Sequence, residues 1–275
     1  MRYGSRTKRF VPRLEVLDVR ALPSVTIAED SSGVVTITGD QSANDIEIRD
    51  TGGSGTDAVT VWVDGVQSDV TFDTAVTKIV LDARGGQDVV AYNLTGSFTD
   101  GTDREVVIHL GNQDDTFTAD LNGSIGADSD VSLKVCGGNG QDNLSVHGAG
   151  TADSPWSIDG HLTVKVYGGN GKDTIDVNYN GLISGTGVFD LSVHGGNGKD
   201  FVRGDVTAAD GSTGELNATV CGGNGKDDMG LMVHVNTDAS PDLTVNAELH
   251  GGHGKDFFDP TAISDNVDIV DTQVH

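Results

Sequence analysis

Aromatic side chains make up only 5% of the 275 residues. Phe, Trp and Tyr usually fill much of a globular core, so their scarcity argues against a bulky core and for one built from small and β-branched residues. Glycine, by contrast, occurs 39 times. Most of these glycines stand at fixed places between runs of Val, Ile, Leu and Thr, which indicates an ordered chain and not a low-complexity one.

Basic residues are few and unevenly distributed. The first 20 residues hold six of the 17 Lys and Arg, and the rest of the chain carries 11 basic against 40 acidic residues, a net charge of -29. Phosphate binding needs clustered Lys and Arg, so we expect no binding to nucleic acid or to an anionic membrane surface. Such an acidic body should attract cations.

Long apolar runs and familiar catalytic motifs are also missing. No segment approaches the roughly 18 apolar residues of a membrane-spanning helix, so no membrane span is expected. The sequence contains no GxSxG elbow and no P-loop glycine pattern. We therefore expect a protein that is not an enzyme.

A short glycine-rich motif closed by aspartate recurs along the chain. The copies are GGQD ending at Asp88, GNQDD at Asp115, GGNGQD at Asp142, GGNGKD at Asp173, Asp200 and Asp227, and GGHGKD at Asp256. Successive aspartates are 27, 27, 31, 27, 27 and 29 residues apart. A fixed period in this range is typical of a solenoid, in which each unit buries its apolar face against its neighbours.

The residues on both sides of each glycine turn alternate between apolar and polar. Leu162, Val164 and Val166 alternate with Thr163, Lys165 and Tyr167, and the pattern resumes after the turn with Ile175 and Val177. This alternation predicts strands with one buried face. Each period supplies two long strands and a shorter segment, so the sequence predicts an all-β fold, a parallel β-solenoid of about 27 to 31 residues per coil.

Residues 25 to 80 differ from the repeats. VTIAEDSSGVVTITG and VTVWVDGVQSDVTF resemble strand pairs joined by turns, the second with an Asp64-Gly65 hairpin signal. We expect an antiparallel β cap that covers the open end of the solenoid. The expected division is a basic leader or tail at 1–22, an antiparallel β cap at 23–80 and the solenoid at 81–275.

The glycine turns have the chemistry of a half-site for a hard cation. Glycines permit tight turns with positive φ whose carbonyl oxygens point to one side, and the closing Asp adds a carboxylate. Coils stacked about 4.8 Å apart could surround a cation with carbonyl and carboxylate oxygens at the 2.3 to 2.6 Å that calcium prefers.

Five copies of the motif resemble the G-G-x-G-x-D-x-U-x nonapeptide of RTX (haemolysin-type) calcium-binding repeats, with the apolar U position at residues such as Leu144 and Ile175. With the two degenerate copies, the resemblance spans residues 85 to 259. It implies that the closing aspartates are carboxylate ligands of Ca²⁺ and that the first and third motif glycines supply carbonyl oxygens. The expected ligands of the five full copies are Gly137, Gly140 and Asp142; Gly168, Gly171 and Asp173; Gly195, Gly198 and Asp200; Gly222, Gly225 and Asp227; and Gly251, Gly254 and Asp256.

The chain departs from the RTX pattern in its spacing. RTX nonapeptides typically follow one another directly and bind calcium on both edges, whereas this chain has one copy in every 27 to 31 residues. We therefore expect a single column of sites along one edge. Asp88 and Asp115 belong to copies that lack part of the glycine set and are the weaker candidates.

Two alternatives remain for these columns of residues. The Asp column could pair with a Lys column at Lys172, Lys199, Lys226 and Lys255 in ion-pair or hydrogen-bond ladders without metal. A second, outward column contains His194, Cys221 and His250, which are zinc-type ligands but lack any CxxC or HExxH spacing. Cys136 and Cys221 are three coils apart, about 14 Å, too far for a disulfide.

The N-terminal segment LEVLDVRALPS, residues 14 to 24, resembles the Arg-rich leaders of bacterial exported surface proteins. This resemblance implies a secreted or cell-surface location, with residues 1–22 poorly ordered or removed.

Two classes of function follow from these observations. The favoured one is a non-enzymatic, extracellular, calcium-stabilised solenoid with a structural or adhesive role, whose partners are calcium ions and cell-surface or matrix components. The alternative is a polysaccharide lyase or epimerase on a parallel β-helix, which would need a base and a Lys or Arg beside a uronate.

Overall fold

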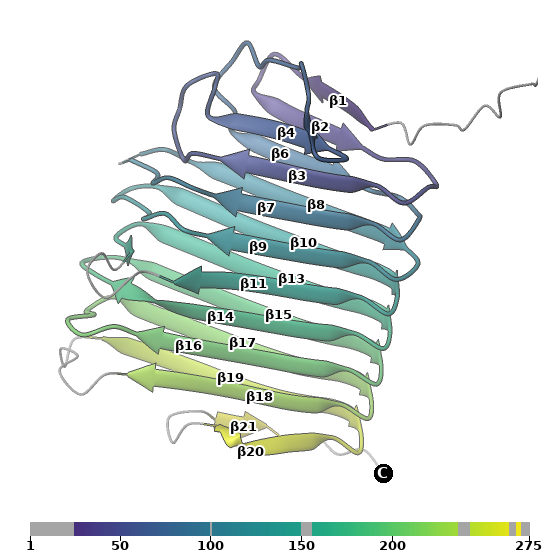
Figure 1. The fold of residues 1–275 in the computed structure, drawn as a ribbon. Coiled ribbons are helices and arrows are strands. Elements are labelled where there is room, and N and C mark those ends of the chain that lie inside the picture. Colours follow the sequence, from purple (N-terminus) through teal and green to yellow (C-terminus); the bar gives the residue numbers. More distant parts are fainter. Residues whose placement is uncertain (1–24, 100, 150–155, 236–242, 264–267, 271–275) are drawn as a thin grey trace, which may run out of the picture.

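The computed structural model describes residues 25–99, 101–149, 156–235, 243–263 and 268–270. The described chain is all-β and forms a parallel β-solenoid of about six coils of roughly 27 residues, as the repeat period predicts (Figure 1). The predicted leader at 1–22 lies outside the described residues. No described segment forms a helix long and apolar enough to cross a membrane.

Each coil contributes one strand to each of two sheets. The ten-stranded sheet, called sheet A here, has the order β1-β2-β6-β8-β10-β13-β15-β17-β19-β21. The bounds of its strands are Thr26–Glu29, Val34–Thr38, Lys78–Asp82, Arg104–Asn112, Asp130–Gly140, His161–Gly171, Val188–Gly198, Glu215–Gly225, Thr244–Gly254 and Asp268–Val270.

The eleven-stranded sheet, called sheet B here, has the order β20-β18-β16-β14-β11-β9-β7-β3-β4-β5, and β12 pairs with β14 beside this path. In that order its strands are Phe257–Ile263, Asp228–Val235, Phe201–Ala208, Thr174–Ile183, Asn143–Ala149, Thr116–Leu121, Val89–Leu94, Asp45–Asp50, Val59–Val63 and Val66–Gln67, and β12 is Ser157–Ile158. The short β12 and the bridge between Phe98 and Ile125 belong to the expected third segment of the coil.

The apolar residues of the alternating sequence pattern are buried in the structure, and the polar residues between them are more exposed. On β13, Leu162, Val164 and Val166 are buried while Lys165 is exposed. The inward rows of sheets A and B form one continuous apolar core between them. Because consecutive coils are stacked in register, Val135, Val166 and Val193 lie one above another.

The glycine motifs lie where strands of sheet A pass into strands of sheet B. β13 ends at Gly171 and β14 begins at Thr174, and the same step is repeated from β10 to β11, β15 to β16 and β17 to β18. These corners form the regular edge on the right of Figure 1. The ladder continues through the motif itself, with Gly169 in register with Gly138 and Gly196. The motif copies are therefore stacked in one column, as the period predicts.

The N-terminal end is closed by antiparallel strands. β1 pairs antiparallel with β2, and β3, β4 and β5 form an antiparallel series. β2 and β3, however, also stack parallel on β6 and β7. Parallel stacking thus begins at Val34, inside the range predicted for the cap, because these two strands belong to a coil that lacks the glycine motif.

A buried ion pair joins this first coil to the next ones. The Arg104 Nε at the start of β8 donates to Asp50 Oδ2 on β3 over 2.9 Å, and neither side chain is exposed. The Tyr92 hydroxyl of β7 donates to the same carboxylate over 3.0 Å. A buried charge that loses its partner is strongly destabilising, so this contact favours one register between the capped coil and its neighbours.

Candidate metal centre

The closing aspartates are gathered at the glycine corners, on the inner side of the chain. Asp88, Asp115, Asp142, Asp173, Asp200 and Asp227 are each at most 2% exposed, and Asp256 is half-buried. Carboxylates are seldom buried this deeply without a partner. The closing aspartates form one column along one edge, and this column includes Asp88 and Asp115 of the two degenerate copies.

One oxygen of each carboxylate binds the neighbouring coil. The backbone N–H of Asp142 donates to Asp173 Oδ1 over 2.9 Å, and the N–H of Asp173 donates to Asp200 Oδ1 over 2.9 Å. The same contact occurs at every step from Asp88 to Asp256, at 2.7 to 3.0 Å. Asn44 begins the series, since its N–H donates to Asp88 Oδ1 over 2.7 Å. These contacts form a continuous carboxylate-to-amide ladder along the corner.

The other oxygen of each carboxylate has no hydrogen-bond partner. The Oδ2 atoms of all seven aspartates are buried and unpartnered: Asp88, Asp115, Asp142, Asp173, Asp200, Asp227 and Asp256. An unsatisfied buried polar atom costs free energy, and a row of them calls for a ligand or a proton. One buried, unpartnered carboxylate oxygen per coil is the main electrostatic feature of the corner.

Burial also changes the proton affinity of the column. Desolvation raises the pKa of Asp88, Asp173 and Asp227 to about 6, from an ordinary value of 3.8. Burial, together with the neighbouring charges of Asp142 and Asp88, raises the pKa of Asp115 to about 7, although the hydrogen bond from the N–H of Asp88 opposes this rise. The pKa values of Asp142 and Asp200 are raised by burial as well. The corner thus favours neutralisation of its carboxylates.

The first motif glycine leaves room for the carboxylate. A Cβ added to Gly168 would lie 2.6 Å from Asp173 Oδ2 and 2.5 Å from the carbonyl oxygen of Gly195. Gly137, Gly195 and Gly222 have equivalent contacts, all at 2.9 Å or less. A side chain at this position would therefore displace either the carboxylate or the next coil.

The third motif glycine is required by the backbone itself. Gly198 has a φ of +151°, and a Cβ there would lie 1.4 Å from the carbonyl oxygen of Gly171. The corner thus needs its glycines for coil stacking, whether or not a metal is bound. An ordered glycine motif by itself does not separate a calcium site from a metal-free ladder.

The expected Lys column makes no ion pairs with the aspartates. Among the described residues, Lys172, Lys199, Lys226 and Lys255 are exposed and form no salt bridge. The predicted pairing of the Asp column with the Lys column is therefore not observed. The hydrogen bonds of the Asp column run instead to backbone amides of the neighbouring coil.

An asparagine ladder, which the sequence analysis missed, runs beside the Asp column. Asn139 Nδ2 donates to Asn112 Oδ1 over 2.9 Å, and three further steps of 2.7 to 2.8 Å lead through Asn170 and Asn197 to Asn224. The repeated Asn in GGNG, together with the in-register stack, was the available signal. Each amide donates to one neighbour and accepts from the next, so the exposed side of the corner is satisfied without a cation.

The donor set at the corner has the chemistry of a calcium site. Asp142 Oδ2 and the carbonyl oxygen of Gly168 both lie 2.5 Å from the position of a Cβ on Gly137, so the carboxylate of one coil and the first-glycine carbonyl of the next face the same small region. Both are hard oxygen donors, the type that Ca²⁺ prefers. The carbonyl of the third glycine, Gly140, points instead at Gly171 in the next coil. The unpartnered carboxylate oxygens and the first-glycine carbonyl oxygens together fit a cation.

The part of the chain that the structure describes contains no group of three or more His, Cys, Asp or Glu that could hold a metal. Each corner offers one carboxylate per coil, so backbone carbonyls would have to supply most of a calcium shell. The same observation removes support for zinc at His194, Cys221 and His250. His194 Nε2 lies 2.9 Å from Ser192 Oγ, and His250 Nε2 lies 2.9 Å from Glu248 Oε2.

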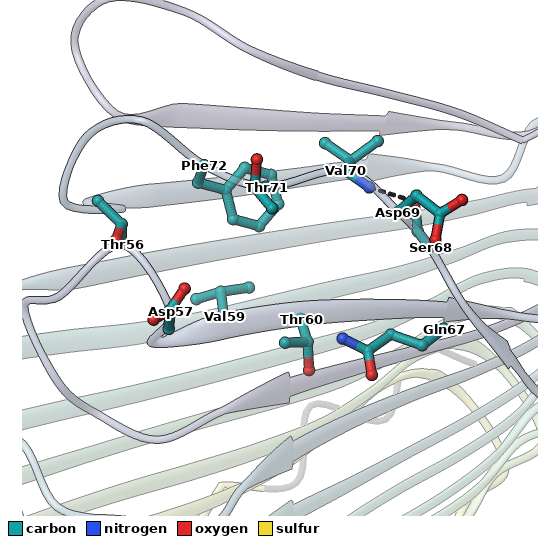
Figure 2. A pocket seen from close by; sticks show the side chains of 10 residues that line it. All are labelled: Thr56, Asp57, Val59, Thr60, Gln67, Ser68, Asp69, Val70, Thr71 and Phe72. Carbon is teal, nitrogen blue, oxygen red and sulfur yellow. Dashed lines mark hydrogen bonds between the residues drawn. The ribbon is translucent and has the colours of Figure 1, made fainter.

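A groove of about 440 Å³ lies at the capped end, lined by residues between Thr56 and Phe72 (Figure 2). Its walls come from the residues before and within β4 and from the segment after β5. Asp57, Gln67, Asp69 and the hydroxyls of Thr60 and Ser68 line it. The Ser68 Oγ accepts the N–H of Val70 over 3.2 Å, so part of this polar wall is already engaged by the loop itself.

Comparison of the chain with protein-family models, with curated proteins and with solved structures gives no match.

Replacing Gly198 with Ala should reduce the free energy of unfolding by about 1 kcal/mol or more, because the backbone conformation is unfavourable for Ala and the Gly171 carbonyl occupies the space. Gly55→Ala is the matched control, since no atom lies within 4 Å of its Cβ position. Chemical denaturation in the presence of a chelator measures both. Equal stability of the two variants would contradict the steric role of the motif.

The metal-free protein should become less stable as pH rises from about 4 to about 7. The folded-state pKa values of the column lie above the ordinary value of 3.8, so the folded state binds more protons than the unfolded state in this interval. The stabilisation is complete below about pH 4 and is lost as pH passes through about 6 to 7. Thermal melting in chelator across this range measures it, and Asp173→Asn should show a weaker dependence. A melting temperature that rises over the interval would contradict the burial of ionisable carboxylates.

Proposed function

We propose that this chain is a non-enzymatic, extracellular β-solenoid with a structural or adhesive role, stabilised by Ca²⁺ at its glycine corners. The observation that supports calcium most directly is the row of seven carboxylates, each with one oxygen bound to an amide and the other buried and unpartnered. Bound calcium would supply positive charge to these oxygens. The chain's own contribution is to hold them in a column at the coil spacing.

The expected ligands are the closing aspartates of the five full motifs, which are Asp142, Asp173, Asp200, Asp227 and Asp256. The first-glycine carbonyls, such as those of Gly168 and Gly195, lie close to them, as described above. The role of calcium is structural, because the negative charge of the column opposes close stacking unless it is neutralised. Asp88 and Asp115 share the burial and the unpartnered oxygen, so they join the candidate column despite their shorter motifs.

The extracellular placement is supported by the leader-like segment at residues 14 to 24 and by the affinity range of calcium sites. Extracellular modules bind calcium at roughly 0.1 to 1 mM, which suits sites with few carboxylates. Recovery of the chain only from the cytosol in cell fractionation would contradict this placement.

A second candidate function is the polysaccharide lyase or epimerase class. One observation favours it: Lys134 and Lys165 are adjacent on the outer face of sheet A, beside the phenol of Tyr167. Elimination at a uronate requires a base and a cation of this kind. Release of unsaturated oligosaccharides from a uronate polymer by the purified chain would establish a lyase, and a changed configuration of the uronate residues without cleavage would establish an epimerase.

Millimolar calcium should raise the melting temperature, and a chelator should lower it. At ten times its Kd, each independent site contributes about 1.4 kcal/mol to the free energy of unfolding, so several sites should shift the transition by at least several degrees. Asp173→Asn, at the centre of the column, should reduce both the shift and the heat of binding in calorimetry.

Asp205→Asn is the matched control, because Asp205 lies on β16, outside the corner column, and its replacement changes the charge by the same amount. It should respond to calcium like the unaltered chain. If melting is the same in chelator and in several millimolar calcium, and no heat of binding is measured, the corner is a metal-free hydrogen-bond ladder.

A further inference from the structure

Two lysines face each other on the outer surface of sheet A. Lys134 on β10 and Lys165 on β13 are direct register partners in the parallel ladder, and both side chains are exposed. Neighbouring strands are about 4.8 Å apart, and like charges directly opposite each other are destabilising. Beyond residue 20 the chain has 11 basic and 40 acidic residues. Acidic partners for the two lysines are therefore abundant in the sequence.

No acidic side chain stands at the outward positions next to the pair. The six nearest outward positions are the register neighbours in β8 and β15 and the residues two places away on β10 and β13, and all six are uncharged: Val107, Ser192, Ser132, Cys136, Thr163 and Tyr167. Among the described residues, neither lysine forms a salt bridge. The two ammonium groups therefore remain available on this surface.

The nearest carboxylates on this face already have partners. Glu105 Oε1 lies 2.8 Å from Lys78 Nζ. Asp190 Oδ2 lies 2.8 Å from His161 Nε2, and Asp190 Oδ1 accepts a hydrogen bond from Asn217 over 2.8 Å. A rotation of Lys134 or Lys165 toward them would compete with these contacts, so the site is open to an anion from outside.

Aromatic rings and hydroxyl groups lie beside the pair. The rings of Tyr167 and His194 are stacked with centroids 5.1 Å apart and planes at 5°, and Lys134 Nζ lies 5.7 Å from the Tyr167 centroid. The hydroxyls of Ser132, Thr163 and Ser192 lie at neighbouring outward positions. Ser192 Oγ lies 2.9 Å from His194 Nε2 and Thr163 Oγ1 lies 3.3 Å from His161 Nε2, and each hydroxyl can still exchange a further hydrogen bond with a ligand.

We propose that Lys134 and Lys165 form a binding site for the carboxylate of an acidic sugar within a glycan chain. A sugar acid combines one carboxylate, for the ammonium pair, with several hydroxyls, for the flanking hydroxyl groups. The acidic body disfavours nucleic acid and other polyanions of high charge density. Val107 is the one aliphatic side chain among the six neighbouring positions, which disfavours a protein partner, because protein interfaces rely on clusters of buried apolar anchors. This site names a partner for the adhesive role proposed above and rests on that role, but it does not require calcium.

Trigalacturonate is a suitable probe, with a neutral trisaccharide and inorganic phosphate as comparisons. Calorimetry or NMR titration of the full chain in chelator should show binding of trigalacturonate that weakens with added salt. Lys134→Gln and Lys165→Gln should each weaken it by about two- to fivefold, in line with exposed charge pairs. Lys165→Arg should restore most of the affinity, because it retains the positive charge.

Lys226→Gln is the matched control, since it removes the same charge from an exposed corner position and should leave the affinity unchanged. Equal binding of the neutral trisaccharide, equal binding of phosphate, or equal affinity in all the variants would overturn the proposal. Calcium titration of the same variants separates this outcome from failure of the calcium proposal, because none of the substitutions alters a corner aspartate.

Discussion

Parallel stacking at a fixed interval of about 4.8 Å is the constraint on which the rest of this structure depends. In such a stack each outward or corner residue meets its counterpart in the next coil, so a repeated side chain must be compatible with a copy of itself. Valine and leucine meet this requirement easily, and they form the continuous core between sheets A and B. Charged and polar residues meet it only through specific arrangements.

The corner shows three such arrangements side by side. Asparagine stacks on asparagine because an amide can donate to one neighbour and accept from the other. Lysine stacks on lysine because its long side chain remains exposed to water, where the repulsion is weak. Aspartate stacks on aspartate by directing Oδ1 to a backbone amide of the preceding coil. Only this third arrangement leaves a buried charge uncompensated.

That uncompensated charge connects the fold to the proposed function. A proton and a calcium ion are two ways to neutralise the same buried oxygens, and the raised pKa values of Asp115 and Asp173 report how strongly the site favours neutralisation. The Lys134 and Lys165 pair on sheet A is the opposite case, a repeated cation without compensation on an acidic molecule. In both cases side chains of the same charge are stacked on each other. Binding of an oppositely charged ligand from solution would reduce the repulsion between them.

The capped end differs because it does not repeat. There the antiparallel strands β1, β4 and β5 replace the next coil, and the buried contact between Arg104 and Asp50 links the capped coil to the solenoid. Asp50 and Arg104 have no counterparts of the same type in register, since Asp50 aligns with Leu94 and Arg104 aligns with Val131. No periodic pattern could indicate such a pair.

The sequence by itself determined the architecture, the register of the coils and the burial of their strands, because the period of the GGNGKD motif and the alternation around residues such as Leu162 and Ile175 express the repeating geometry directly. It also predicted that the closing aspartates would share one column. Tertiary structure alone decided how Asp173 divides its two oxygens, that Asn170 belongs to a ladder, that Gly198 is needed for steric reasons, and that Arg104 is buried against Asp50. These features depend on atoms from coils 27 or more residues apart meeting within hydrogen-bond distance, and a pattern along one chain specifies which residues meet but not which of their atoms do.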